Sequence, residues 1–386
     1  MSPAPRDPGV RLGMMSLEDG ARVDFAWLRG ERRLKVLSSM ETQGLDALIL
    51  GGVGNVHYVS GGRLLGRAGV LPFGPYAVVV RSSGRVHLLS TWDEGVPPEI
   101  EREDLYPLSW NPMNLMASLA AIPGLREAHR IGTDGMTPSF ALLAAVLGVS
   151  EFVDAGPVLD VARRVKTAEE ITCLTVAAAI SESALSVMES ALQPGITERE
   201  LLARYYSAVA GLGVPVAPTE SVCFATPLRG SVPFRHVPRD RGVREGELMV
   251  LAPGALYAGY EAGLACTRMV GGSRSVRSTA LAGRCASGMD ALLAACRPGA
   301  VGTDLYRAWE RLGFGESSVL LAHGLGLGAE PPVIGLGRGR DAALEEGMVL
   351  SVQSWVTQAG VGGCLERATV LVTAGGAEVL TRYGRL

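Results

Sequence analysis

The pattern of apolar and polar positions predicts helices and strands in alternation along the first part of the chain. Residues 25–50 begin with an amphipathic helical pattern, "FAWLRGERRLKVLSSMETQG", and end in the apolar strand "LDALIL". Residues 76–91, "YAVVVRSSGRVHLLST", are typical of a β-hairpin with a Ser-Gly turn. We therefore expect a small α/β domain at residues 23–157, preceded by a flexible leader at residues 1–22.

The remaining residues, 158–386, contain a pattern that occurs twice. Segments 192–214 and 296–315 each carry a helix end, a Pro-Gly pair, a capping Thr, an acid and an amphipathic helix. Each follows a long Ala-rich helix and precedes a strand-rich stretch. Thr167 and Glu170 fit a capping box at the start of the first long helix. The repeat predicts a pseudo-symmetric domain whose sheet lies against four helices.

The stretch "VLAPGALYAGYEAGLACTR" (250–268) lies between the two copies. Its beginning is expected to be a fully buried strand, "PGA" a turn, and the rest a returning strand. Small residues in such a hairpin leave room for a ligand or for close backbone approach. Tyr260 and Glu261, the second being the only acid of the stretch, are candidates for substrate contacts.

Composition and charge exclude several classes of partner. A formal charge of −3 over 386 residues argues against nucleic acid or an anionic membrane as the main partner. No stretch has the uninterrupted apolar length of a membrane span, and the first residues lack a secretory pattern. The six cysteines have no metal-site spacing, which favours reduced thiols. We expect a cytoplasmic protein with a small-molecule substrate.

Six motifs in order resemble the creatinase/prolidase/aminopeptidase P family. They are "KTAEEITCLTVAAAI", "PGITERELL", "GYEAGLACTR", "HGLGLGAEPP", "LEEGMVLSVQ" and "ERATVLVT", and the likeness covers residues 25–384. The resemblance implies an α/β (α+β) fold, with a small N-terminal creatinase-like domain followed by a pita-bread domain.

Metallopeptidases of this family carry five metal ligands, and the resemblance aligns them with five positions here. The two Asp fall at Ala252 and Gly263, the His at His323, and the two Glu at Gln353 and Glu366. Only two of the five remain, whereas even catalytic zinc usually keeps about three protein ligands. We therefore expect no metal and no other cofactor.

The resemblance to creatinase implies that the same pocket can act without a metal ion. The implied reaction is hydrolysis of a C–N bond, with a histidine as acid and base. The matching residue here is His236. His323 is the second catalytic candidate, able to donate to a substrate carbonyl or carboxylate. Glu366 could hold an amino or guanidino group, or instead pair with Arg268 or His323.

Gln353 can hydrogen-bond a substrate but cannot bind metal tightly. Because Ala265 and Gln353 stand where creatinase-type enzymes need carboxylates for a guanidinium, creatine itself is disfavoured as substrate.

Arg67 lies in "NVHYVSGGRLLGR", which resembles a loop that enters the partner subunit's pocket in creatinase. It is a candidate carboxylate clamp, with Arg63 as the alternative after a register shift. This resemblance implies a homodimer.

Two functional hypotheses follow. The first is a metal-independent enzyme acting on a C–N bond of a small amide, amidine or amine, as a hydrolase, lyase or cyclase, for example in specialised biosynthesis. The second is an inactive pita-bread protein that binds a peptide or metabolite.

Overall fold

The computed structural model describes residues 22–62, 76–90, 95–109, 111–135, 145, 148, 151–214, 221–227, 232–235, 237–272 and 275–382. The expected leader therefore lies almost wholly outside the described residues. The chain divides into two compact units, residues 1–163 and 164–386. Each unit is described by itself.

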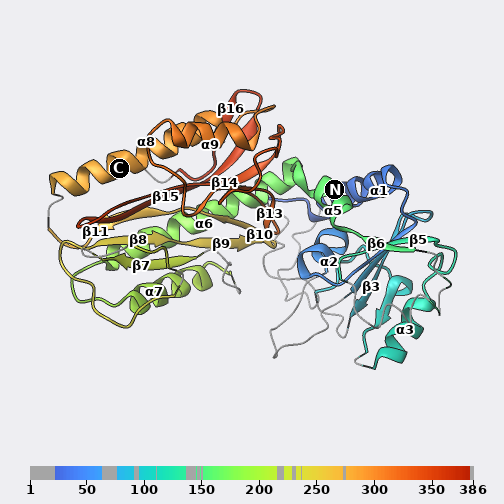
Figure 1. The fold of residues 1–386 in the computed structure, drawn as a ribbon. Coiled ribbons are helices and arrows are strands. Elements are labelled where there is room, and N and C mark those ends of the chain that lie inside the picture. Colours follow the sequence, from blue (N-terminus) through green and yellow to red (C-terminus); the bar gives the residue numbers. More distant parts are fainter. Residues whose placement is uncertain are drawn as a thin grey trace, which may run out of the picture. The chain divides into compact units, whose positions relative to one another are not determined.

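The N-terminal unit is built on a six-stranded mixed sheet (Figure 1). Its strand order is β4 (Leu105–Pro107), β3 (Arg85–Ser90), β2 (Tyr76–Val80), β1 (Ala47–Leu50), β5 (Arg130–Thr133) and β6 (Glu151–Asp154). The expected hairpin is β2–β3 and is antiparallel, whereas β5 pairs in parallel with both of its neighbours.

The helices of this unit are α1 (Phe25–Thr42), α2 (Val53–Ser60), α3 (Pro112–Ala120) and α5 (Gly156–Arg164), with the short 3-10 helix η1 (Arg102–Asp104). Asp24 begins α1, since its side chain accepts a hydrogen bond from the backbone N–H of Trp27. The predicted passage from an amphipathic helix to a buried strand is therefore present in α1 and β1.

The C-terminal unit begins with two helices and a strand group. These are α6 (Ala168–Ala191), α7 (Glu198–Gly211), β7 (Val222–Thr226), β8 (Leu248–Ala252), β9 (Gly254–Tyr257), β10 (Tyr260–Gly263) and β11 (Cys266–Met269). The second half follows with α8 (Val276–Ala295), α9 (Gly302–Glu310), β12 (Leu320–Gly326), β13 (Gly328–Gly335), β14 (Val349–Gln358), β15 (Gly362–Thr373) and β16 (Gly376–Val379). The α/β architecture predicted from the sequence is confirmed.

The two halves repeat each other in backbone detail. In the first, the N–H of Gly195 donates to Val243 and the N–H of Val243 donates to Ile196. In the second, the N–H of Gly299 donates to the carbonyl of Leu344, and the N–H of Leu344 donates to the carbonyl of Ala300. Both glycines of the Pro-Gly pairs have positive φ, which glycine adopts without strain. The predicted internal repeat is thus a structural repeat.

Helix caps follow the prediction in two of the three helices for which one was predicted. Thr167 and Glu170 form the expected capping box, and Thr197 caps α7 in the same way. At the start of α9 the expected capping Thr is wrong. Val301 occupies the N-cap, and the side chain of Asp304 accepts its backbone N–H at 3.0 Å.

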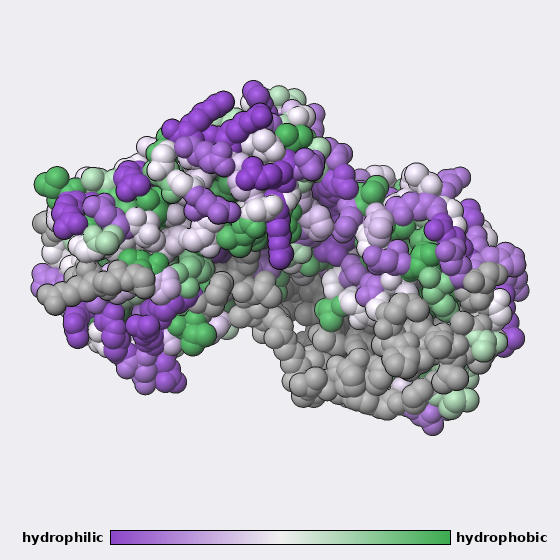
Figure 2. Space-filling view, in the orientation of Figure 1, coloured by the Kyte–Doolittle hydropathy of each residue, from purple (hydrophilic) through white to green (hydrophobic). Residues whose placement is uncertain are grey.

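The helices lie against the sheets through regular apolar faces. α6 packs on β9 and β10, and α8 packs on β14 and β15. α7 buries Leu201, Tyr205 and Val209, which are spaced by four residues, and exposes polar residues between them. Figure 2 shows this hydrophilic surface over α7, at the lower left of the view.

α6 is long and apolar enough to cross a membrane by length and composition alone, and 44% of its most apolar window is buried inside the protein. Its buried side chains, among them Leu174 and Leu185, pack within the fold as those of a core helix do.

Threonine side chains join the two halves along a seam between β10 and β11 on one side and β15 on the other. Thr267 Oγ1 donates to the carbonyl of Leu365 and accepts its N–H, at 3.1 and 2.8 Å. Thr369 Oγ1 forms the same double contact with Gly263, at 2.8 and 3.1 Å. We call these contacts, together with the backbone bridge between Ala265 and Arg367, the threonine seam.

The stretch 248–269 folds differently from the predicted single hairpin. β8 is fully buried as expected, but the chain does not turn back at "PGA". It turns at Ala258 and Gly259, both of positive φ, so that β9 and β10 form a tight hairpin of their own. β11 then returns along β8. The turn prediction gave too much weight to Pro253, which only interrupts the extended chain.

Candidate functional site

Four side-chain positions form a row across the sheets at the seam. Gln353 of β14 pairs directly with Arg367 of β15, and Arg367 forms the backbone bridge with Ala265. The register of β8 and β11 brings Ala252 beside Ala265, and the two share one apolar cluster. Since directly opposed residues of an antiparallel pair share a face, these side chains lie on one side of the sheet. We call Ala252, Ala265, Arg367 and Gln353 the seam row.

Gln353 and Arg367 are in direct contact within this row. The Nε of Arg367 donates to the side-chain oxygen of Gln353 at 3.2 Å. The amide nitrogen of Gln353 in turn donates to the carbonyl of Leu320 at 2.9 Å, which fixes which end of the amide faces the guanidinium. Both residues are buried, with 9% of Gln353 and 7% of Arg367 exposed. Because an amide carries no charge, Gln353 orients Arg367 without neutralising it.

Aromatic rings pack beside the alanine end of the row. Phe224 of β7, Phe234 and Trp355 of β14 contact one another edge to face, with ring centroids 5.4 to 6.0 Å apart. They belong to the cluster that contains Ala252 and Ala265. This end of the row is therefore apolar and packed against aromatic rings.

His323 of β12 lies on the same face as the row, because it pairs with Ser351, two residues before Gln353 on β14. Its side chain is 2% exposed, and Nδ1 lies 2.9 Å from the carbonyl oxygen of Gly324. A carbonyl only accepts, so Nδ1 carries a proton and the neutral ring has its acceptor at Nε2. A histidine in this tautomer can take up a proton at Nε2.

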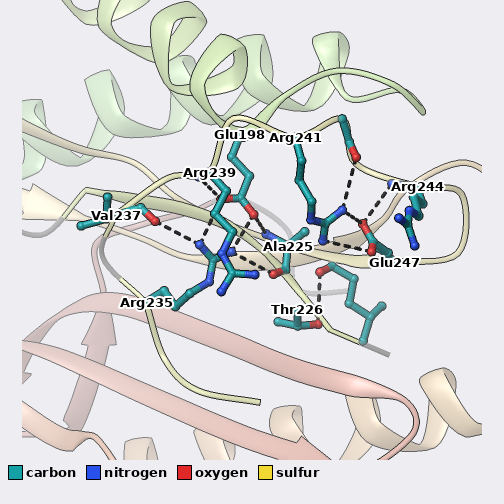
Figure 3. A network of polar contacts seen from close by, with 11 residues as sticks. Glu198, Ala225, Thr226, Arg235, Val237, Arg239, Arg241, Arg244 and Glu247 are labelled. Atoms are coloured by element: carbon teal, nitrogen blue, oxygen red, sulfur yellow. Dashed lines mark hydrogen bonds and ion pairs between the residues drawn. The ribbon is translucent and has the colours of Figure 1, made fainter. Parts of the chain in front are cut away.

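A buried carboxylate holds the segment that leads away from Phe234 (Figure 3). Glu198, at the start of α7 and fully buried, pairs with Arg235 at 2.6 Å. It also accepts the backbone N–H groups of Ala225 and Arg239, at 2.9 and 2.6 Å. Arg235 donates further to the carbonyl of Val237 at 3.0 Å. One glutamate thereby ties α7 to β7, Arg235 and Arg239.

A second carboxylate, that of Glu247, holds Arg241 and Arg244, which come shortly after Arg239 in the sequence. Glu247 accepts two hydrogen bonds from the guanidinium of Arg241, at 2.9 and 3.0 Å, and one from the backbone N–H of Arg244 (Figure 3). Side-chain hydrogen bonding to Glu247 raises the pKa of Arg241, so this guanidinium stays charged.

The structure brings only part of the predicted site together. His323 and Gln353 share the face of the seam row, and Glu261 of β10 shares its face with Gly263, which contacts Thr369 of β15. His236, Arg67 and the alternative Arg63 lie outside the described residues. The roles of all these residues stay predictions.

Glu366 does not lie with Gln353 and His323 as predicted. Strand alternation puts it on the face of Cys364 and Ala368, which pack under α8, and it pairs in register with Ser354. Its neighbour Arg367 occupies the place in the row. The role that the resemblance assigns to Glu366 stays a prediction.

Two further placements need correction. Tyr260 is fully buried, and its hydroxyl donates to Glu170 of α6 at 2.8 Å, so it points away from the seam row. Gly263 lies in close contact with the preceding chain, because a Cβ there would lie 3.0 Å from the carbonyl oxygen of Pro253. Ala265 is the hairpin position that belongs to the row.

Sequence reasoning missed Arg367 and the aromatic rings. The apolar residues at 364, 368, 370 and 372 alternate along the predicted strand, and this period of two places residue 367 on the opposite face. That signal was available in the sequence. The gathering of Phe224, Phe234 and Trp355 was not, since it depends on three separate segments.

Comparison with known proteins agrees with this fold. The model of metallopeptidase family M24 matches residues 172–374, and that of the creatinase/prolidase N-terminal domain matches residues 32–165. The chain belongs to metallopeptidase family M24. The family resemblance stated from the six motifs is therefore confirmed, and membership places the chain among hydrolases of C–N bonds.

Relatives cover nearly the whole chain. The Xaa-Pro dipeptidase of Pyrococcus furiosus is 26% identical over 92% of this chain and 99% of its own. The solved prolidase of Pyrococcus horikoshii OT3 has a TM-score of 0.74, with 22% identity over 92% of this chain and 99% of its own. The Xaa-Pro dipeptidase from Bacillus anthracis has a TM-score of 0.76 at 19% identity, covering 93% and 99% of the two chains.

The seam row does not fit the metal ion that the M24 family name implies. A divalent cation needs several oxygen or nitrogen ligands, and the row offers two methyl groups, a neutral amide and a guanidinium. A guanidinium inside the site also repels a second cation. Within the described residues, no group of three His, Cys, Asp or Glu side chains could hold a metal ion.

Proposed function

We propose that this chain hydrolyses the C–N bond of a small, carboxylate-bearing amide or amidine without a catalytic metal ion. The observation that carries the proposal is the contact between Gln353 and Arg367 in the seam row. It places a guanidinium, rather than a carboxylate ligand, at this position of the row. A guanidinium binds a planar carboxylate through two parallel hydrogen bonds.

The other residues of this face supply the remaining functions. His323 accepts a proton at Nε2 from an attacking water and returns it to the leaving nitrogen. The rings of Phe224, Phe234 and Trp355 pack against the apolar part of the substrate and keep water from its surroundings. His236, the acid and base implied by the resemblance to creatinase, lies outside the described residues and comes directly after Arg235 in the sequence.

The test is a panel of small carboxylates with amide, ureido or guanidino C–N bonds, including Xaa-Pro dipeptides. Each is paired with its neutral carboxamide. Thermal shift and product formation are measured for the wild type and for Arg367→Met. We expect carboxylates to bind, carboxamides not to bind, and Arg367→Met to remove the difference. Equal binding by wild type and Arg367→Met contradicts the proposal.

Metal independence is measured separately on the same protein. Elemental analysis should find much less than one divalent ion per chain, and treatment with a chelator should leave turnover and melting temperature unchanged. About one Mn, Co, Zn or Fe per chain, lost together with turnover, would show that the proposal is wrong.

An inactive binding protein is the second candidate. Ala252, Leu365 and Trp355 fill the apolar end of the row, with 0 to 4% exposure, as in a packed core. His323→Asn separates the two candidates, because it retains a hydrogen-bonding side chain and loses proton transfer. A hydrolase loses turnover and still binds the carboxylate, whereas a binding protein shows no turnover even in the wild type.

A further inference from the structure

The C-terminal unit contains a buried ion pair that the proposed reaction does not use. The ammonium group of Lys166, just before α6, lies 2.9 Å from the carboxylate of Glu330 on β13, and the two side chains are 2% and 5% exposed. Lys166 also donates to the carbonyl of Arg164 at 3.3 Å. Taking two charges out of water is costly, and apolar residues of similar volume are often as stable as a buried pair. Stability alone therefore does not account for this pair.

The carboxylate of Glu330 holds the turn between β12 and β13. One of its oxygens accepts a hydrogen bond from Lys166, and the other accepts the backbone N–H of Leu327 at 3.2 Å. The carboxylate lies directly over Gly326, where any Cβ would collide with both of its oxygens. Glycine at this position makes room for the carboxylate, and the carboxylate in turn fixes the turn.

The same hairpin carries the hydrogen bond that sets the tautomer of His323. Gly324 pairs with Glu330, whereas His323 pairs with Val333, so that the two prolines between Glu330 and Val333 form a bulge. A Cβ at Gly324 would collide with the carbonyl oxygen of Pro331, which shows how closely the strands approach here. The carbonyl of Gly324, placed by this contact, accepts the Nδ1–H of His323 at 2.9 Å.

We infer that Glu330, held by Lys166, is a positioning residue for His323. Its carboxylate fixes the hairpin, and the carbonyl of Gly324 then keeps the proton of the ring on Nδ1. The hydrogen bond made by one ring nitrogen decides which of the two carries the proton, so Nε2 stays the acceptor. The use of Nε2 as a base rests on the proposed function, whereas the tautomer itself does not.

The test is the tautomer of His323 in the full chain. It is read by nuclear magnetic resonance from the two ring-nitrogen shifts of isotope-labelled histidine, at slightly alkaline pH, where histidine is ordinarily neutral. His323→Asn identifies the signal. Two double variants remove both buried charges and differ only in the residue that replaces Glu330. Lys166→Met with Glu330→Gln keeps an acceptor for the N–H of Leu327, and Lys166→Met with Glu330→Leu does not.

We expect the Nδ1–H form to be in about ten-fold excess in the wild type and in the double variant with Glu330→Gln. The excess should fall below about two-fold in the double variant with Glu330→Leu. Gly326→Ala displaces the carboxylate without removing a charge, and it should act in the same way. Glu345→Gln is the matched control, because it breaks a more exposed pair with Arg164 and should leave the tautomer unchanged.

Two results overturn the inference. One is a wild-type His323 with its proton on Nε2, and the other is a wild-type tautomer ratio in both Gly326→Ala and the double variant with Glu330→Leu. Turnover is measured in parallel. This double variant should lower kcat at least about ten-fold, because a displaced base loses its alignment, and should leave carboxylate binding by Arg367 unchanged. If the carboxylate panel gives no turnover, the proposed function fails while the tautomer ratio still decides this inference.

Discussion

Glu366 and Arg367 are neighbours on β15, and their side chains lie on opposite faces of the sheet. One faces a cavity under α8, and the other contacts Gln353 in the seam row. A shift of one residue in a strand exchanges its two faces. Of the two neighbours, only Arg367 therefore shares the face of Gln353.

Gln353→Glu should weaken carboxylate binding at least ten-fold. The new carboxylate would pair with Arg367 and neutralise the guanidinium that the amide of Gln353 only orients. The measurement is the dissociation constant of the tightest carboxylate in the proposed panel. Gln358→Glu, nearer the end of the same strand, is the control and should change it little. Undiminished binding by Gln353→Glu would exclude Arg367 as the carboxylate group.

Glu198→Gln should destabilise the protein by about 3–5 kcal/mol, because it leaves the buried guanidinium of Arg235 without its counter-charge. Urea unfolding measures the effect. The control is Arg199→Ala, which breaks the pair with Asp240. Both of those side chains are more than 60% exposed, and such pairs contribute about 0–1 kcal/mol. Similar losses in the two variants would contradict the role assigned to Glu198.

Thr267→Val tests the threonine seam. Valine keeps the volume of threonine and removes the hydroxyl that contacts both the N–H and the carbonyl of Leu365. The two buried backbone groups lose this partner, at a cost of about 1–3 kcal/mol. Thr172→Val on the exposed side of α6 should cost less than about 0.5 kcal/mol. A silent Thr267→Val would mean that the seam does not depend on this hydroxyl.

Acid should destabilise the N-terminal unit through His87, a buried residue of β3. Burial lowers the pKa of His87, Asp104 opposes the shift, and Arg85 adds to it. Below about pH 6.5 the unfolded chain takes up a proton that folded His87 does not. The unfolding free energy therefore falls as the pH drops through that value, by at most about 1.4 kcal/mol per pH unit.

The measurement is urea unfolding between pH 7.5 and 5.5 for the wild type, His87→Gln and His129→Gln. His87→Gln should show a smaller loss than the wild type, while the exposed His129 makes a matched control. The nearby groups of β3, η1 and β4 that face His87 are Arg85, Asp104 and Tyr106, and they are unchanged in these variants. Identical pH profiles for all three proteins would contradict this prediction.

Local patterns were enough to predict most of the fold. The Pro-Gly pairs, the capping box of α6 and the buried run of β8 depend on neighbouring residues, and each is present in the structure. The turn at Ala258 and Gly259 was missed because Pro253 is the stronger local turn signal. Long-range register, rather than local propensity, decides that position.

The candidate site was less predictable for the same reason. The order of the motifs located β15, but a motif does not indicate which of two adjacent side chains lies on the face of the seam row. Only the pairing of Gln353 with Arg367 decides it. The ring contacts between Phe224, Phe234 and Trp355 join residues that are far apart in the sequence. Local periodicity cannot predict such contacts.

The threonine seam has a consequence for how the C-terminal unit opens. The amides of Gly263 and Leu365 are bonded to hydroxyl groups of the opposite half, and those of Ala265 and Arg367 to backbone carbonyls across the seam. Their exchange with deuterium requires the two halves to part. These four amides should exchange together, and they report on separation of the repeats rather than on the fraying of any one strand.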